Sequence, residues 1–162
     1  MKTYSSKPQL IFKGILVLIL VLFLIFVYAR ANAKDVPLPD IEKDLLSNAQ
    51  LKDEMDKCSD RDLMQNFGLD FTNYDSYIYY KSNEALAVEE ILIIKAKAKN
   101  DLSAVQDAVE TRISDQRALY DGYGADQVAL LDDSVVLIKG NYLFYCCAPN
   151  IDKYEEVFRH AI

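Results

Sequence analysis

Two stretches, YDSYIYYK at residues 74–81 and VEEILIIKAK at residues 88–97, set the architecture of this chain. Both are rich in aromatic and β-branched side chains, and a polar turn separates them, which predicts a pair of antiparallel strands. In the second stretch, Leu92 and Ile94 fall on one face whereas Ile93 falls on the other. Apolar residues on both faces predict a central strand that is covered on each side.

The regions around this pair predict helices and a second pair of strands. The longest helical pattern begins at Asn100 or Asp101 and ends near two glycines. Residues 135–138 and 142–147 flank Lys139-Gly140-Asn141, which is a hairpin signal. Shorter helices are expected after Asp40, after Ser59 or Asp60, over residues 125–131 and over residues 152–158. The sequence therefore predicts a single small α+β domain with a mostly antiparallel sheet of about four strands packed by helices.

The first part of the chain is apolar and basic. Residues 10–29 read LIFKGILVLILVLFLIFVYA, which is about the length that spans a hydrocarbon core of ~30 Å. Lys2, Lys7 and Lys13 outnumber the basic residues that closely follow this run, so we expect the N-terminus inside the cell. The predicted parts are a cytoplasmic tip and transmembrane helix or signal segment at residues 1–33, a spacer at 34–39 and an extracytoplasmic domain at 40–162.

Two interpretations of the apolar segment stay open. Its length favours an uncleaved, single-pass anchor that contacts membrane lipid through residues 10–29. Ala31-Asn32-Ala33 instead matches the A-x-A pattern of a signal-peptide cleavage site, and processing there would release a secreted domain. Both interpretations place the domain outside the cytoplasmic membrane. No cysteine closes the segment, so a lipoprotein anchor is unsupported.

The remainder of the chain is strongly acidic. The whole chain has a net charge of -7 and residues 1–33 contribute +4, so the rest carries -11. An acidic surface repels phosphate backbones and gains nothing from counterion release, so nucleic acid is a disfavoured partner. An envelope protein or a cell-wall ligand is the expected partner.

Few residues could carry metal or nucleophilic chemistry. His160 is the only histidine, whereas catalytic zinc usually takes two or three, so no metal or cofactor is expected. Cys58, Cys146 and Cys147 are expected mainly to pack, with a bridge to Cys58 or a reactive thiol as alternatives. Adjacent strand residues point to opposite faces, so we expect one of Cys146 and Cys147 to be buried and the other half-exposed.

Glu90 needs a charged partner, because its carboxylate lies on the same strand face as the apolar side chains of Leu92 and Ile94. Arg112, beside the apolar stripe of the long helix, is its expected partner through a bidentate contact that seats the helix on the sheet. Gln116 extends this polar edge by one turn, and Tyr123 and Gln127 follow near the helix end. These five residues are the candidate binding site, as a shallow groove; the structural alternative is ordinary packing of tyrosine rings and polar edges.

A set of motifs also resembles a known family. The motifs are Glu90-Ile91-Leu92-Ile93-Ile94-Lys95-Ala96, Arg112, Gln116, Gly122-Tyr123-Gly124, Gln127 and Gly140-Asn141-Tyr142. Together, over about residues 36–160, they resemble the domain of unknown function 4358 family, small exported or membrane-anchored proteins of Gram-positive anaerobes. The resemblance implies an extracytoplasmic location and a single α+β domain, and it implies no activity.

Three functional hypotheses follow from the sequence. The first is a non-enzymatic envelope module that binds through its acidic surface or its tyrosine-lined edge. The second is an extracytoplasmic hydrolase that uses acidic residues such as Glu90, which would need a deep pocket around that carboxylate. The third is an accessory subunit of a membrane complex.

Overall fold

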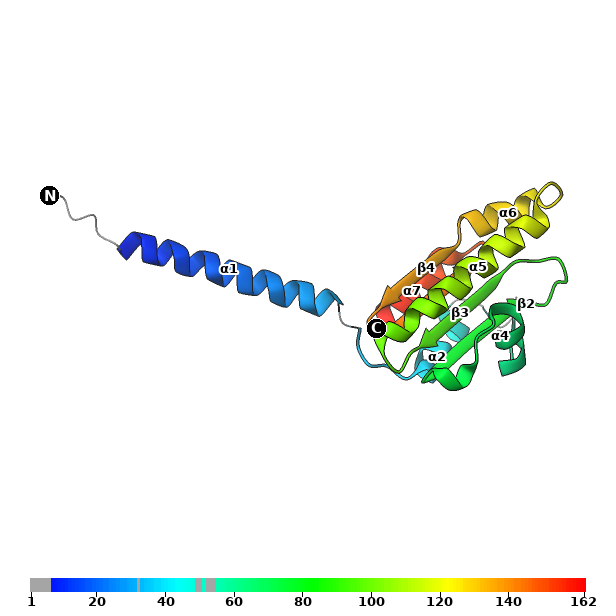
Figure 1. Cartoon of the computed structure of the whole chain (residues 1–162), viewed down its shortest axis with the longest axis horizontal. Coiled ribbons are helices and arrows are strands. Elements are labelled where there is room, and N and C mark those ends of the chain that lie inside the picture. Colours follow the sequence, from blue (N-terminus) through cyan, green and yellow to red (C-terminus); the bar gives the residue numbers. More distant parts are fainter. Residues whose placement is uncertain (1–6, 32, 49–50, 52–54) are drawn as a thin grey trace. The chain divides into compact units, whose positions relative to one another are not determined.

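The computed structural model describes residues 7–31, 33–48, 51 and 55–162, which divide into two compact units, Met1–Asn32 and Ala33–Ile162. The first unit contains one 25-residue helix, α1 (Lys7–Ala31), drawn in blue in Figure 1. Its described side chains, at positions 11–25 and 27, are all exposed. Among the described residues, no helix combines the length and the hydropathy needed to cross a membrane.

The second unit is built on one antiparallel sheet of five strands. The strands are β1 (Met55–Lys57), β2 (Ser76–Ser82), β3 (Glu90–Lys95), β4 (Val135–Lys139) and β5 (Tyr142–Cys147), in the order β1-β2-β3-β5-β4. All four pairings are antiparallel. The predicted α+β class and the two predicted strand pairs are therefore confirmed, and β3 is the central strand as its pattern indicated.

The expected count of about four strands was one too low. β1 pairs with β2, with Met55 opposite Ser82 and Lys57 opposite Tyr80. This edge strand has only three residues, of which Met55 alone is buried. Such a short segment in a charged stretch shows no alternation from which a strand could be predicted.

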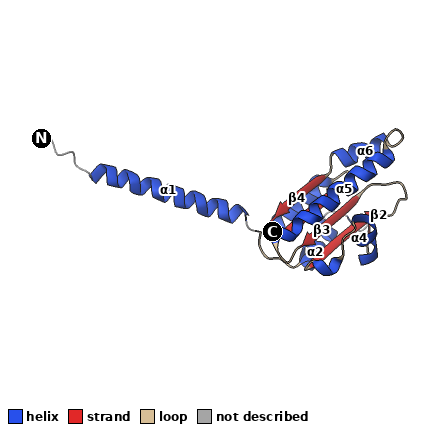
Figure 2. Cartoon of the chain, in the orientation of Figure 1, coloured by secondary structure: helices blue, strands red, loops and turns tan. Residues whose placement is uncertain are grey.

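Helices cover both faces of the sheet, so the domain has three layers (Figure 2). One face packs against α2 (Leu38–Asn48) and α7 (Ile151–Ala161). The other packs against α4 (Asp60–Phe67), α5 (Leu102–Tyr120) and α6 (Ala125–Asp132). Two short 3₁₀ turns, η1 (Phe71–Asn73) and η2 (Lys99–Asp101), precede β2 and α5. Alternate residues of β3 enter the two cores, as the sequence predicted.

The double coverage corrects one expectation about the cysteines. Cys146 and Cys147 do point to opposite faces, but both are fully buried, because helices cover each face. All three cysteines are free. Their environments therefore agree with the packing role, and no bridge to Cys58 is present.

Local signals explain where the helices begin and end. Ser59 is the N-cap of α4, and the Asp62 carboxylate accepts hydrogen bonds from its N–H at 2.8 Å and its hydroxyl at 2.6 Å. Gly68 ends α4 in the left-handed conformation. α2 begins at Leu38, two residues before the predicted cap Asp40, because proline is well tolerated in a first helical turn.

Candidate functional site

Glu90 is the first residue of β3, and its side chain is fully buried on the sheet face that packs against α5. Its neighbours on that face are the apolar side chains of Leu92 and Ile94. A carboxylate in such surroundings is costly unless charged and hydrogen-bonding partners surround it. Glu90 therefore needs polar partners in this core.

Arg112 of α5 supplies the opposite charge. Its Nε lies 3.2 Å from Oε1 of Glu90, and its Nη2 lies 3.3 Å from Oε2. This is the two-pronged geometry that guanidinium and carboxylate groups favour. The predicted Glu90–Arg112 pair is confirmed, and it joins the middle of α5 to the central strand.

Two tyrosines complete the hydrogen bonding of the carboxylate. The hydroxyl of Tyr79 donates to Oε2 at 3.0 Å, and that of Tyr145 donates to Oε1 at 3.1 Å. Both tyrosines lie directly opposite Leu92, on β2 and β5, so each sits diagonally across from Glu90. Sequence reasoning missed them, because the contact depends on β3 lying between β2 and β5.

A second ring of side chains holds this first one in place. With its amide oxygen turned toward Arg112, Gln116 accepts from Nε at 3.1 Å. Asn66 donates to the Tyr79 hydroxyl at 3.0 Å. Phe67 meets the Tyr79 ring edge-on, at 5.3 Å between centroids, and its own ring lies 5.9 Å from the Arg112 guanidinium carbon. We call Glu90 with these six residues (Asn66, Phe67, Tyr79, Arg112, Gln116 and Tyr145) the Glu90 network.

The electrostatics of the Glu90 network fix its protonation. Burial, followed by the negative charge of Glu90, raises the pKa of both Tyr79 and Tyr145 above the usual value of 10.0. Burial works to lower the pKa of Arg112, but the attraction of Glu90 outweighs it, and the net shift is upward. Both tyrosines are therefore neutral donors at neutral pH, and the carboxylate has no free face to offer a substrate.

The remaining two predicted binding residues lie elsewhere. Gln127 accepts a hydrogen bond from the backbone N–H of Val88 at 3.0 Å. Tyr123 is exposed in the turn between α5 and α6, with its ring 5.6 Å from that of Tyr120. The structure thus brings Glu90, Arg112 and Gln116 together and leaves these two at the end of α5. A binding role for any of the five stays a prediction.

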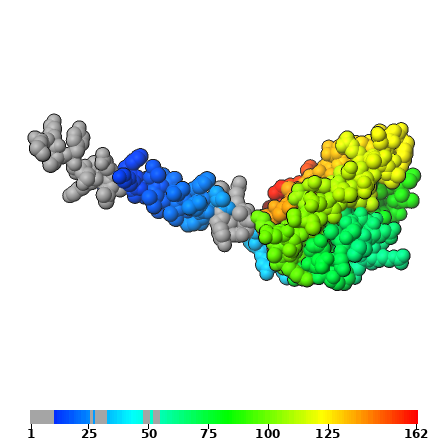
Figure 3. Space-filling model, viewed as in Figure 1, coloured from blue at the N-terminus to red at the C-terminus, as the bar shows by residue number. Residues whose placement is uncertain are grey.

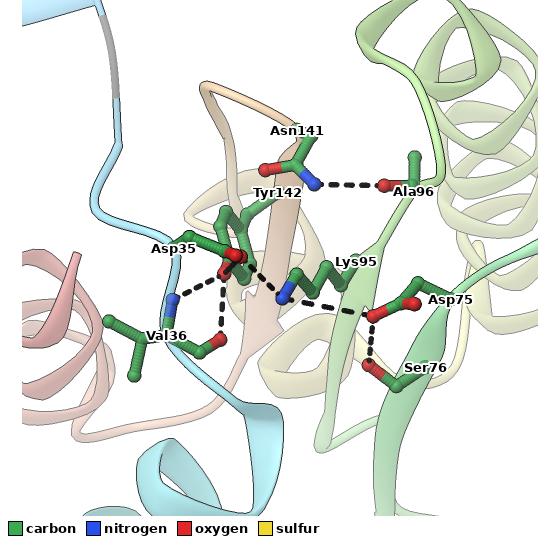
Figure 4. A network of polar contacts seen from close by, with 8 residues as sticks. All are labelled: Asp35, Val36, Asp75, Ser76, Lys95, Ala96, Asn141 and Tyr142. Atoms are coloured by element: carbon green, nitrogen blue, oxygen red, sulfur yellow. Dashed lines mark hydrogen bonds and ion pairs between the residues drawn. The ribbon is translucent and has the colours of Figure 1, made fainter.

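A second polar network lies at the other end of β3 (Figure 4). The Tyr142 hydroxyl accepts from the backbone N–H of Val36 at 2.8 Å and donates to the carbonyl of the same residue at 2.7 Å. Lys95, the last residue of β3, holds Asp35 at 2.6 Å and also lies 3.7 Å from Asp75. Its ammonium nitrogen is 5.5 Å from the centre of the Tyr142 ring.

The turn between β4 and β5 extends this network to Ala33. Asn141 donates from its side chain to the carbonyl of Ala96 at 2.9 Å. Gly140 has a φ of 60°, and a Cβ atom there would lie 2.7 Å from the Cβ of Ala33. We call Ala33, Asp35, Val36, Lys95, Gly140 and Tyr142 the N-terminal clamp, because these residues hold the segment before α2 on the sheet.

Charge strengthens the clamp on both sides. The hydrogen bond and charge of Lys95 lower the pKa of Asp35 below its usual 3.8. The hydrogen bond that Lys95 donates to Asp35, against the effect of burial, raises the pKa of Lys95 above its usual 10.5. Both groups are therefore charged across the neutral range. Residues 34–39 were expected only as an extended spacer, and no pattern in the sequence predicted these contacts.

The other polar residue considered as a metal or catalytic candidate, His160, lies on a helix. Within the described ranges, no group of three or more His, Cys, Asp and Glu side chains could hold a metal ion. His160 is largely exposed on α7, where its Nε2 lies 3.6 Å from Glu156. The hollow that His160 lines between α2 and α7 is shallow and also includes Asp44 and Lys153.

Comparison with known proteins finds a family model that matches this sequence. The family model described as Domain of unknown function (DUF4358) matches residues 47–148, which include the strands of the Glu90 network and, of the clamp, Lys95, Gly140 and Tyr142. Neither the curated proteins nor the solved structures return a match.

Proposed function

The chain belongs to the DUF4358 family, and from that premise we propose that it is a membrane-anchored binding module of the cell envelope. In this proposal, residues 10–29 cross the cytoplasmic membrane with the N-terminus inside. The domain Ala33–Ile162 then stands outside, where it binds a protein or cell-wall component and catalyses no reaction.

One observation carries the proposal, which is the apolar sequence of residues 10–29 together with the basic residues Lys2, Lys7 and Lys13 near its start. A helix of 25 residues is about 37 Å long, which exceeds a hydrocarbon core of ~30 Å. Each leucine-sized side chain left in water forgoes about 1.5–3 kcal/mol of burial free energy, and the described side chains of α1 are all exposed. The apolar stretch that would cross the membrane is the whole of residues 10–29.

The N-terminal clamp favours retention of the anchor. The A-x-A pattern ends at Ala33, which packs against Gly140 in the folded domain. The next residues, Asp35 and Val36, are tied to Lys95 and Tyr142. A folded domain therefore holds the bond after Ala33 close to its own surface, where a peptidase that needs extended substrate has poor access.

The Glu90 network favours binding over hydrolysis. A catalytic carboxylate needs an open site beside it, with room for substrate or water. Glu90 is instead fully buried and accepts four hydrogen bonds from Arg112, Tyr79 and Tyr145. The three hollows lined by residues of α2, α7 and the start of α5 include neither Glu90 nor Arg112.

Protease accessibility in intact protoplasts tests the proposed address. External trypsin should degrade the domain while a cytoplasmic marker survives, and the protein should sediment with membranes after carbonate washing. The variant L18R/L22R, which interrupts the apolar run, should lose membrane association, whereas the matched L18A/L22A variant should keep it. Protection of the wild-type domain until the cells are lysed would contradict the proposal.

A further inference from the structure

The end of the domain opposite the N-terminal clamp has its own surface. β2 runs from the clamp toward this end and β3 returns, so the β2–β3 connection at residues 83–89 lies about a strand length, ~20 Å, from Lys95. The turn between α5 and α6 lies at the same end, where Gln127 bonds to Val88. We call residues 83–89 and 118–127 the distal surface; its α5–α6 part is the yellow projection in Figure 3.

Exposed apolar side chains gather on the distal surface. Of the large hydrophobic residues described in the domain, the three most exposed are Leu86 at 71%, Tyr123 at 67% and Leu119 at 62%. The next, Met64 on α4, is only 46% exposed. Single exposed apolar residues are ordinary on protein surfaces, but a cluster that polar groups surround marks an interaction site.

The same two segments carry acidic residues without ion-pair partners among the described residues. The distal surface contains Glu84, Glu89, Asp121 and Asp126 and has no lysine or arginine. Within the described part of the chain, none of these four carboxylates forms an ion pair, in contrast to Asp132, which pairs with Arg117. The acids give the distal surface a negative field that attracts basic groups and repels anionic lipid and a second copy of itself.

Two contacts order the backbone of the distal surface. Gln127 ties the β2–β3 connection to α6 through the Val88 N–H. A Cβ atom at Gly124 would lie 2.7 Å from the Tyr120 ring, so glycine lets that ring pack closely under the turn. Such prior order lowers the entropy lost on binding.

We propose that the distal surface is the binding site for a protein segment in which basic side chains flank apolar ones. The apolar side chains of the partner would contact Leu86, Leu119 and Tyr123, and its basic groups would pair with the carboxylates of the same two segments. This inference rests on the proposed function as a binding module, and it names the kind of partner.

The test uses the full chain in zwitterionic nanodiscs and three labelled hexapeptides, KKLLKK, EELLEE and KKSSKK. KKLLKK should bind, and it should slow amide exchange in residues 83–89 and 118–127. L86S/Y123S should weaken its binding at least tenfold, because two apolar contacts are lost. D121N/D126N should weaken binding about tenfold at low salt, whereas D107N/E110Q, the same charge change on the middle of α5, should change it less than twofold.

Several results would overturn the inference. They are an absence of KKLLKK binding, equal binding of EELLEE or KKSSKK, and an equal loss in D107N/E110Q, which would indicate attraction to the general acidity of the domain. Because these measurements use purified protein, they are independent of the topology of the chain in cells. If KKLLKK does not bind but external trypsin cleaves the domain in protoplasts, the distal surface alone is rejected. If KKLLKK binds but the domain is protected from external trypsin, the proposed location outside the membrane is rejected.

Discussion

Glu90 and Lys95 are the first and last residues of β3, and each is the centre of a polar network. They lie about 17 Å apart along the strand and on opposite faces of the sheet. The Glu90 network joins α5 to the sheet. The N-terminal clamp joins the segment before α2 to the same sheet. The two ends of β3 therefore hold α5 and the segment before α2, respectively.

The two networks differ in how much water reaches them. Glu90 is fully buried, so its pairing with Arg112 takes place where a lone charge is very costly. In the clamp, the Asp35 side chain is 86% exposed, so its ion pair with Lys95 is screened. The clamp must therefore draw most of its strength from the Tyr142 hydrogen bonds and from the contact between Ala33 and Gly140.

The largest expected effect comes from Glu90→Gln. Neutralising Glu90 leaves Arg112 without its counter-charge, and breaking a buried pair typically costs about 3–5 kcal/mol. Arg117→Gln, on the same helix, removes an exposed pair with Asp132 and should cost under about 1 kcal/mol. Urea unfolding of both variants measures the difference. A Glu90→Gln protein as stable as Arg117→Gln would show that the Glu90 network does not seat α5.

The next effect tests packing in the clamp. Gly140→Ala combines a left-handed backbone with the close approach of Ala33, so it should cost about 2–3 kcal/mol. Gly68→Ala is the control, because φ is 68° there with open space around it, and about 1 kcal/mol is expected.

The double variant A33G/G140A makes this test specific to Ala33. Removing the Ala33 methyl should recover part of the cost of Gly140→Ala, as measured by thermal unfolding, because the Ala33 backbone nitrogen still lies 3.0 Å from the new Cβ. If A33G/G140A is no more stable than Gly140→Ala alone, residue 33 is not held at that turn.

A smaller effect is expected for Tyr142→Phe. The Tyr142 hydroxyl bonds the N–H and the carbonyl of Val36, and both groups can turn to water once it is gone, so the net loss is about 1 kcal/mol. Hydrogen exchange of the Val36 amide should accelerate while that of β3 stays unchanged. Tyr80→Phe removes a comparable hydroxyl bond to Glu42 and should leave Val36 unaffected. Equal protection of Val36 in all three proteins would argue against the clamp.

The smallest effect is the pH dependence of the clamp, and its direction differs from that of the Glu90 network. The pKa of Asp35 is lowered, so its contribution is present above about pH 4 and is lost as pH falls through the lowered value. The pKa values of Tyr79 and Tyr145 are raised, so their contribution is present below pH 10 and is lost as pH rises. Val36 protection factors should therefore fall in acid, and global stability should fall in alkali. A Val36 protection factor that stays constant into acid would show that the Asp35–Lys95 pair does not stabilise the clamp.

The difference between the networks also explains what the sequence could predict. The Glu90–Arg112 pair was predictable, because a carboxylate on an apolar strand face needs a cation, and Arg112 flanks the stripe of the predicted helix. The tyrosine donors were not, because they depend on the order of β2, β3 and β5. The long helix and both strand pairs carry strong periodic patterns and were predicted within a few residues.

The clamp and β1 had no such pattern. Val36 and Tyr142 are 106 residues apart in the chain, and a backbone group bonded to one hydroxyl leaves no periodic trace. β1 is too short and too charged to alternate. Burial of both Cys146 and Cys147 was missed for a related reason, because it depends on helices that cover both sides of β5.

The intact mass of the protein purified from native membranes shows whether the domain stays joined to its anchor. We expect a mass that includes residues 1–33, with α1 still attached to the clamped domain. A mature protein that begins at Lys34 would contradict this expectation, because cleavage after Ala33 would leave a secreted domain without a membrane anchor.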